Sequence, residues 1–453
     1  MRVWPLVRMA IGEALLRGDH PPFVPVNERA GLARKWRDLL KGLTTLVARG
    51  APGERAELLF YSGPRNLVIW NGRTHDRFAD PLIIAATKLG HRSVVAEYRF
   101  GAASGFPRAI ECPRYNITPS LWAASVLHAR RPKPDPLTIP GLKGLLNDAA
   151  HEAPMPGLAA LATKLHDLDL GRAYHGRILD RVRPTNVFLV CWYGVDHMGV
   201  AQACYDRGIG CVDLQHGVQG KGHLAYGTWA AVPPEGYGLM PSVFWCWDDP
   251  SADHIRSWST GTPIRAFALG DPWSDQDPGR SAEGIWKNDG RTRVLYSAFL
   301  PDALPSAVRE AIRATREQVQ WMIRTHPVNP EMAEELETII VKEGLSDTAF
   351  VSRTEELPLM AALHDCQLHV TRYSSVVMEA AAKGVPSVAI DPRAVDVFGP
   401  FIADGRLTIA LTTEALIAQV RSPRPIGRNS VQLPPLEERL ALVLQGDRSQ
   451  RKR

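Results

Sequence analysis

Long uncharged apolar runs are missing from this 453-residue chain. No stretch of about 18 such residues occurs, so the sequence predicts no membrane-spanning helix. The N-terminus combines basic and apolar side chains as a signal peptide does, but Arg8 and Glu13 interrupt the apolar run and no small-residue cleavage site follows. We therefore expect a cytoplasmic protein.

Cysteine is scarce and scattered. Six cysteines occur without a C-x-x-C pair or a metal-ligand spacing: Cys112, Cys191, Cys204, Cys211, Cys246 and Cys366. This pattern indicates reduced thiols and supports neither a disulfide framework nor a zinc site. The pairs Asp167/Asp169 and Asp275/Asp277 match the D-x-D sequence of a metal-binding motif. We interpret them as solvated residues, because the first pair lies in a helical stretch and the second in a loop. We expect no metal ion and no cofactor.

The excess of positive charge is small. The net charge is +5 and the pI about 8.9, with basic residues gathered near both ends of the chain. No aromatic-basic recognition motif accompanies them, so a solvated basic face is the preferred interpretation and no nucleic-acid partner is expected.

The sequence does contain strand and helix patterns that alternate along the chain. In the first half, residues 65–72 and 91–98 read as buried strands around a helix, and residues 186–193 and 210–217 repeat the pattern. Such alternation requires parallel strands joined by right-handed crossovers. The length of the chain favours two domains.

From residue 242 the alternation restarts with "SVFWCWDD" and continues to residue 391. We therefore expect an N-terminal domain over residues 1–240, opened by a helical segment, and a C-terminal domain over residues 241–453. The predicted fold class is α/β, with two Rossmann-like, doubly wound parallel sheets.

The most specific motif is "HVTRYSSVVMEAAAKGVPSVAIDP", residues 369–392. A strand ends at Tyr373, Ser374 and Ser375 stand where a helix begins, and Glu379 follows one turn later. Free N–H groups at a helix N-terminus bind phosphate, so the serines suit a nucleotide's phosphates and Glu379 its ribose. The alternative is that the serines only cap the helix and Glu379 faces solvent.

A second motif, "MIRTHPVNPE", delivers Arg324 and His326 to the end of another predicted strand. Pro327 then turns the chain. Both side chains suit an anionic pyrophosphate, although such a histidine is also common as a hydrogen-bonded structural residue.

A third motif, "VDLQHGVQGKGH", ends a buried strand at His216. Open α/β sheets bind ligands at the carboxyl ends of their strands, and the glycines that follow favour close backbone approach or mobility. His216 is thus a candidate general base, with a hydrogen-bonded residue buried between the domains as the alternative.

The order of these motifs, Q-H-G, T-H-P, then Y-S-S with "EAAAKGVP", resembles GT-B-fold transferases of bacterial surface polysaccharides. Similar motifs occur in capsule polysaccharide synthesis proteins, in polysialyltransferases and in CDP-glycerol-type polyol-phosphate transferases. The resemblance covers residues 66–392 as short motifs. It implies two domains that face a cleft, and a cytoplasmic enzyme that uses a nucleotide sugar.

Carried over residue by residue, the resemblance implies roles for most of these side chains. His326, Ser374 and Ser375 would hold the donor's phosphates, with Glu379 near the ribose. Independently of the resemblance, Arg324 or Arg372 could stabilise the charge of the leaving group and so replace a metal ion. His216 would face the acceptor as the base. On the acceptor side we expect Gln215 and Gly217, as well as Asn71 and Glu97, although strand-end Asn and Glu residues are commonly turn residues.

We therefore expect an inverting, metal-independent glycosyltransferase that acts on a bacterial surface polysaccharide or its lipid-linked precursor. For a lipid-linked acceptor, the N-terminal segment would suit peripheral contact with the inner face of the cytoplasmic membrane. The alternatives are a polyol-phosphate transferase, an enzyme like UDP-N-acetylglucosamine 2-epimerase, and a non-catalytic scaffold. Sialyl transfer is disfavoured because the acidic-acidic-glycine motif of polysialyltransferases has no convincing copy in the first half.

Overall fold

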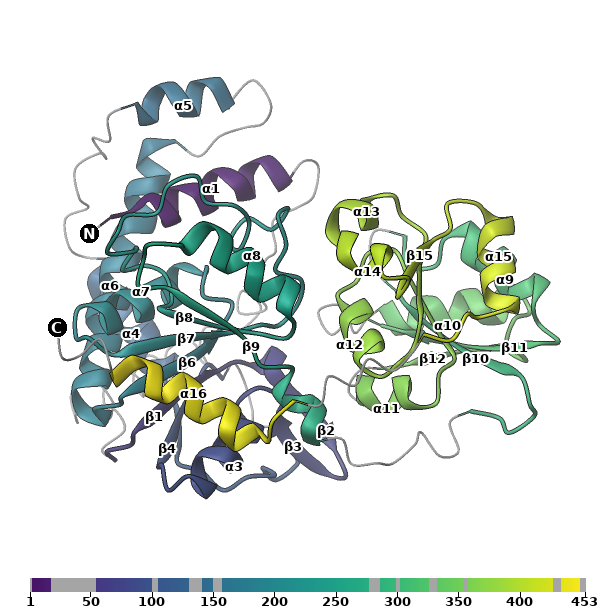
Figure 1. Cartoon of the computed structure of the whole chain (residues 1–453), viewed down its shortest axis with the longest axis horizontal. Helices are drawn as coiled ribbons and strands as arrows, with labels where there is room; N and C mark the ends of the chain where they lie inside the picture. The colour runs from purple at the N-terminus through teal and green to yellow at the C-terminus, as the bar shows by residue number, and fades with distance from the viewer. Residues whose placement is uncertain are drawn as a thin grey trace.

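Two parallel β-sheets, each covered by helices on both faces, make up the two domains (Figure 1). The domains lie side by side, and the larger one carries the N-terminal part of the chain. The α/β class with two Rossmann-like domains predicted from the sequence is confirmed. The computed structural model describes residues 2–17, 54–99, 105–129, 141–149, 157–276, 286–298, 302–325, 332–353, 357–426 and 433–448.

The first sheet has seven parallel strands in the order β5-β4-β1-β6-β7-β8-β9. Their bounds are β1 (Leu58–Ser62), β4 (Ser93–Glu97), β5 (Arg114–Asn116), β6 (Asn186–Val190), β7 (Gly210–Leu214), β8 (Val243–Cys246) and β9 (Arg265–Ala268). The five inner strands are buried along their whole length, because helices cover both of their faces.

Successive residues of each inner strand pack into two different cores. Leu59 and Tyr61 of β1 belong to one core, and Leu58 and Phe60 to the other. The first core is covered by α1 (Trp4–Arg17), α4 (Thr118–His128), α6 (Leu158–Val182), α7 (Val195–Tyr205) and α8 (Asp249–Ser259). The second is covered by α3 (Ala79–Lys88) and α16 (Leu436–Arg448).

The expected domain boundary at residues 240/241 is wrong. The segment predicted to open the second domain forms β8, which pairs with β7, and the next segment forms β9, which pairs with β8. Both strands therefore complete the first sheet. Local apolar patterns show that a segment is a strand, but they do not show which sheet it joins.

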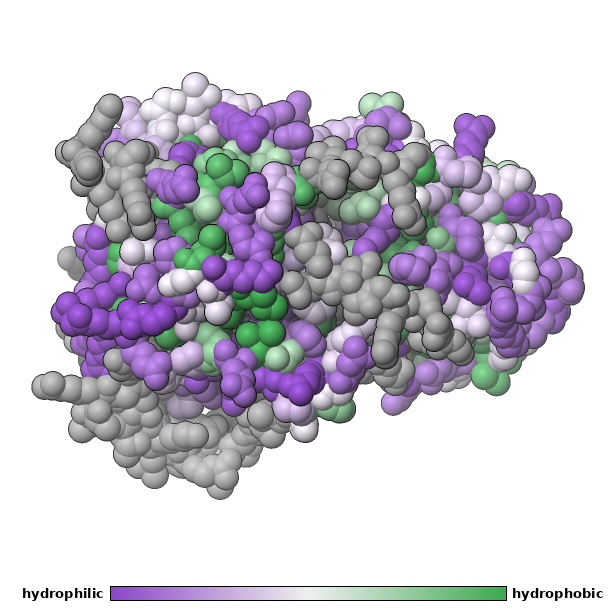
Figure 2. Space-filling view, turned by 60° about the horizontal axis from the view of Figure 1, so that its bottom comes forward, coloured by the Kyte–Doolittle hydropathy of each residue, from purple (hydrophilic) through white to green (hydrophobic). Residues whose placement is uncertain are grey.

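The chain also returns to the first domain at its C-terminal end. Leu436, Leu440 and Val443 of α16 pack into the second core of the first domain, next to α3. The second domain is therefore an insertion between β9 and α16. Figure 2 brings the side that carries α3 and α16 forward and shows hydrophobic residues between hydrophilic ones. Leu89 and Leu442 are among the exposed apolar side chains of the described residues.

The strand predicted at residues 65–72 does not belong to the parallel sheet. Instead, β2 (Leu67–Trp70) and β3 (Arg73–Asp76) form an antiparallel hairpin. Asn71 and Gly72 have φ angles of 48° and 68°, as a tight two-residue hairpin turn requires. The first strand of the parallel sheet is β1, seven residues earlier than expected.

The second sheet has six parallel strands in the order β12-β11-β10-β13-β14-β15. Their bounds are β10 (Thr292–Ser297), β11 (Val319–Arg324), β12 (Ala349–Ser352), β13 (Leu368–Thr371), β14 (Ser387–Ala389) and β15 (Leu407–Ile409). The helices of this domain are α9 (Ser306–Ala314), α10 (Met332–Lys342), α11 (Leu359–His364), α12 (Val376–Ala382), α13 (Arg393–Val397), α14 (Gly399–Ala403) and α15 (Thr413–Arg421). These elements match the predicted alternation of the second half.

The N-terminal helix α1 is part of the protein core. Its apolar residues pack against α6 and against α5 (Leu142–Ala149), and Trp4 and Leu15 are the large apolar side chains of α1 that are exposed among those described. Two basic side chains near its start are also engaged, since Arg2, which precedes the helix, pairs with Glu235 and Arg8 donates to the Thr228 carbonyl. The described side chains of this helix therefore offer little apolar surface for the membrane contact expected of it. Among the described residues, no helix is both long and apolar enough to cross a membrane.

Candidate functional site

His216 lies directly after β7, at the carboxyl edge of the first sheet, as the sequence predicts. Its Nε2 is 3.1 Å from the Cys191 Sγ and 3.3 Å from the Tyr193 Oη. Its Nδ1 is buried and has no hydrogen-bond partner among the described residues. Nε2 is therefore held by residues that follow β6, and Nδ1 has no hydrogen-bond partner among the described residues.

The surroundings of His216 keep its imidazole neutral. Burial, the neighbouring His223 and the positive charge of Arg77 lower the pKa of His216 to about 3. A histidine with a lowered pKa is uncharged at neutral pH, so one of its ring nitrogens has a lone pair that can accept a proton. Negative charge that binds nearby would raise this pKa and strengthen the base.

Gln215 organises the loop that carries His216. Its side chain is fully buried, donates to the Gly217 carbonyl at 2.7 Å and accepts from the Trp247 N–H at 2.6 Å. The same amide nitrogen lies 3.8 Å from the Met378 sulfur of the second domain. The polar groups of Gln215, predicted to contact the acceptor, are therefore already engaged by its own loop and by the segment that follows β8.

The His216 loop contacts the start of α12 in the second domain. A Cβ placed on Gly217 would lie 3.5 Å from the Ser375 Cβ, and Val218 packs into the apolar cluster beneath α12. A Cβ at position 217 would thus be in van der Waals contact with Ser375. The Q-H-G and Y-S-S motifs, which are far apart in the sequence, therefore lie together in space.

Ser374 and Ser375 lie between β13 and α12, as predicted, and both are half-buried. Ser375 makes no side-chain capping hydrogen bond, whereas the Ser374 Oγ accepts from the Val376 N–H at 3.4 Å. The capping alternative therefore does not account for the Ser375 hydroxyl, which points to a role outside the helix.

Glu379 is buried in α12, which rules out the solvent-facing alternative. Its Oε2 has no hydrogen-bond partner among the described residues. Burial raises the pKa of Glu379 to about 7, against the opposing charge of Arg77 in the first domain. A buried carboxyl with one unused oxygen can receive a ligand hydroxyl, which is the chemistry expected of a ribose contact.

The basic residues predicted for the donor site occupy strand ends in the second domain. Arg324 is buried at the end of β11, with its Nη1 3.4 Å from the Ser352 Oγ. Arg372 pairs with Asp391, and its other terminal nitrogen, Nη1, is buried without a hydrogen-bond partner among the described residues. His326 lies outside the described residues.

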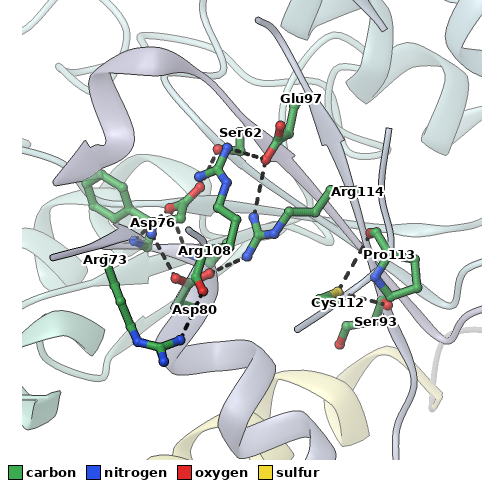
Figure 3. A network of polar contacts seen from close by, with 12 residues as sticks. Ser62, Arg73, Asp76, Asp80, Ser93, Glu97, Arg108, Cys112, Pro113 and Arg114 are labelled. Carbon is green, nitrogen blue, oxygen red and sulfur yellow. Dashed lines mark hydrogen bonds and ion pairs between the residues drawn. The ribbon is translucent and has the colours of Figure 1, made fainter. Parts of the chain in front are cut away.

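Two residues expected on the acceptor side have structural roles instead. Asn71 occupies the exposed hairpin turn, so the turn alternative holds. Glu97 lies at the end of β4, where its carboxylate binds three arginines, Arg99, Arg108 and Arg114. Figure 3 shows Glu97 with Arg108 and Arg114. Because this ion network occupies both carboxylate oxygens, we assign Glu97 no acceptor contact.

Arg77 is a residue of this region that the sequence interpretation missed. It follows β3, its guanidinium lies 4.6 Å from the centre of the Phe78 ring, and its Nε is buried without a partner among the described residues. Its charge lowers the pKa of both His216 and Glu379, which belong to different domains. The predicted strand over residues 65–72 gives no sign of this role, because it is the β2–β3 hairpin that positions Arg77.

Metal-binding clusters of three or more His, Cys, Asp or Glu side chains do not occur among the described residues. Asp167 and Asp169 are exposed on α6, in agreement with their interpretation as solvated helix residues. Asp277 of the second D-x-D pair lies outside the described residues.

Comparisons with known proteins agree on the fold. No family model matches the sequence, and no curated protein matches it either. Among solved structures, the UDP-GlcNAc 2-epimerase of Methanocaldococcus jannaschii in complex with UDP-GlcNAc and UDP aligns with a TM-score of 0.50 and 11% identity, over 86% of this chain and 99% of that one. The chain shares the two-domain, GT-B-like architecture of that enzyme.

Two further structures align over similar lengths. The UDP-GlcNAc 2-epimerase of Neisseria meningitidis bound to UDP-GlcNAc has a TM-score of 0.48 and 10% identity, over 87% of this chain and 100% of that one. The glycotransferase of kitacinnamycin has a TM-score of 0.44 and 15% identity, over 87% of this chain and 95% of that one.

Proposed function

We propose that this chain is a glycosyltransferase that moves a sugar from a nucleotide-activated donor to a hydroxyl of a bacterial surface polysaccharide or its lipid-linked precursor. The observation that carries the proposal is the close approach of Gly217, in the His216 loop, to Ser375: a Cβ placed on Gly217 would lie 3.5 Å from the Ser375 Cβ. It joins a candidate base from one domain to a candidate phosphate-binding segment from the other.

In this proposal the second domain holds the donor. Ser375 and Ser374 bind the phosphates, Glu379 binds a ribose hydroxyl, and Arg324 or Arg372 balances the charge of the departing diphosphate. His326, in the same strand-end motif as Arg324, is proposed for the phosphates as well. The Methanocaldococcus jannaschii epimerase, which has a similar fold, was solved in complex with UDP-GlcNAc and UDP, which supports a nucleotide sugar as the ligand class.

The first domain supplies the base. His216 takes the proton of the acceptor hydroxyl while that oxygen bonds to the anomeric carbon of the donor sugar. The bond from this carbon to the diphosphate oxygen breaks, and the electron pair leaves with the nucleotide. Such a direct displacement inverts the anomeric configuration.

Replacing Ser375 by alanine tests the donor site. We expect calorimetric titration with CMP, CDP, UDP and GDP to show binding of one nucleotide, and Ser375→Ala to weaken it about tenfold through the lost hydrogen bond to a charged oxygen. Ser422→Ala, at an exposed serine of the same domain, is the matched control. Binding of none of the four nucleotides would instead favour the non-catalytic scaffold.

The transfer reaction should not need a divalent metal ion. Because Arg77, Arg324 and Arg372 offer positive charge around the proposed diphosphate, we expect the rate to stay within about twofold in excess EDTA. Loss of activity on chelation, with recovery on adding magnesium or manganese, would contradict this expectation.

A 2-epimerase is the second candidate because two buried carboxyl groups hold protons near neutral pH. Burial raises the pKa of Asp213 to about 8 and that of Glu379 to about 7. An epimerase would exchange the proton at C2 of UDP-GlcNAc with solvent in the absence of any acceptor. Deuterium uptake at C2 from heavy water, followed by NMR, therefore separates the two candidates.

A further inference from the structure

Asp196, in the first turn of α7, carries a carboxylate that two other elements hold in place. The His175 Nε2 from α6 donates to its Oδ1 at 3.0 Å, and the Tyr98 hydroxyl that follows β4 donates to its Oδ2. The Asp196 side chain nevertheless remains 35% exposed. One face of this oriented carboxylate is therefore open to a ligand.

A buried hydrogen-bonded pair, Tyr61 and His175, supports this carboxylate. The Tyr61 hydroxyl of β1 donates to the His175 Nδ1 at 2.9 Å, and both side chains are almost fully buried. An acidic residue in the first turn of a helix is already stabilised by the helix dipole and needs no such support. Three polar side chains from three elements instead fix the direction of one carboxylate, which is how binding groups are preorganised.

Two aromatic side chains adjoin the Asp196 carboxylate, because Tyr98 donates to it and His197 is the next residue in the chain. The Tyr98 and His197 rings lie 5.6 Å apart, and both are half-buried at the carboxyl edge of the first sheet. The His197 Nδ1 lies 3.1 Å from the Cys191 carbonyl, and the Cys191 thiol contacts His216. Asp196 thus occupies the same edge of the sheet as the proposed base and is connected to it through His197 and Cys191.

We propose that Asp196, Tyr98 and His197 form the acceptor subsite and bind a neutral sugar residue of the acceptor. The inference rests on the proposed function and deepens it by naming the class of acceptor. A carboxylate only accepts hydrogen bonds, so it selects a pair of sugar hydroxyls, while the rings cover the apolar face of the pyranose. An acceptor sugar with its own carboxylate is repelled.

Saturation-transfer NMR with matched ligands tests the subsite. The probes are methyl β-glucoside, methyl β-galactoside, methyl N-acetyl-β-glucosaminide and methyl β-glucuronide, the last of which differs from the glucoside by a carboxylate. We expect at least one neutral glycoside to bind, and the glucuronide to bind at least tenfold more weakly than the glucoside. Asp196→Asn should weaken binding of the neutral glycoside about tenfold. It should also narrow the difference in affinity between the glucoside and the glucuronide. Asp253→Asn, at an exposed carboxylate of α8, should change neither.

The outcomes distinguish this inference from the proposed function. If nucleotide binding depends on Ser375 while Asp196→Asn leaves sugar binding unchanged, or no glycoside binds, the subsite is overturned and the donor site stands. If sugar binding depends on Asp196 but no nucleotide binds, the subsite holds and the transferase proposal fails. Tyr98→Phe, which removes one hydroxyl, should weaken sugar binding less than Asp196→Asn does. Because two variants are compared, a folding defect in one of them does not decide the test.

Discussion

His216→Ala should lower the rate of sugar transfer by about 10²–10⁴-fold, the usual contribution of a positioned general base. Its affinity for the donor nucleotide should stay within about threefold, because the proposed phosphate contacts come from Ser374 and Ser375 of the second domain. Steady-state transfer rates and calorimetric titration of the same preparations measure the two quantities. The variant removes the ring that contacts Cys191 and Tyr193 but leaves the Gln215 hydrogen bonds of the loop in place.

A surface variant and the pH dependence provide the controls. His364→Ala, at an exposed histidine of α11, should transfer sugar at the normal rate. Because the pKa of His216 is lowered to about 3, its imidazole is already neutral at about pH 5, and a rise to about pH 7 recruits no more of this base. Normal turnover by His216→Ala would remove this residue from the mechanism.

Glu97→Gln should destabilise the first domain by about 3–5 kcal/mol, since it leaves positive charges in a buried network without their carboxylate. The Glu97 side chain is only 4% exposed, and the Arg114 side chain, which also binds Asp80 at 2.6 Å, is 7% exposed. Figure 3 shows these groups converging between β4, β5 and the start of α3. A lower midpoint of urea unfolding would report the loss.

The matched control is an ion pair at the surface. Asp347→Asn breaks the pair with Arg316, in which both side chains are about half exposed, and should cost no more than about 1 kcal/mol. Equal effects of the two substitutions would show that the Glu97 network contributes no more than an exposed pair.

Much of the fold was predictable because strands buried on both faces read as short apolar runs between turns. β4, β6 and β7 followed from the sequence for this reason. β1 did not, because the apolar stretch of β2 competed with it, although Asn71–Gly72 is a hairpin signal. The placement of β8 and β9 needed long-range pairing, which no local pattern records.

The candidate site was predictable where it lies at strand ends. His216, Ser374 and Ser375 stand where an apolar strand stops, so the sequence marks them. The environment of Asp196 was not predictable, because its partners His175 and Tyr98 are 21 and 98 residues away in the chain. The engagement of Glu97 was not predictable either, because the apolar pattern of a strand does not show that Arg99, Arg108 and Arg114, at 2, 11 and 17 residues along the chain, converge on its carboxylate.

The return of α16 to the first domain has a consequence for synthesis on the ribosome. The second core of the first sheet lacks Leu436, Leu440 and Val443 until the chain has grown past the whole inserted domain. The apolar face shared with α3 therefore stays open to chaperones or to wrong partners while the second domain, continuous from β10 to α15, can already fold. In this protein the domain that is translated first is the one completed last.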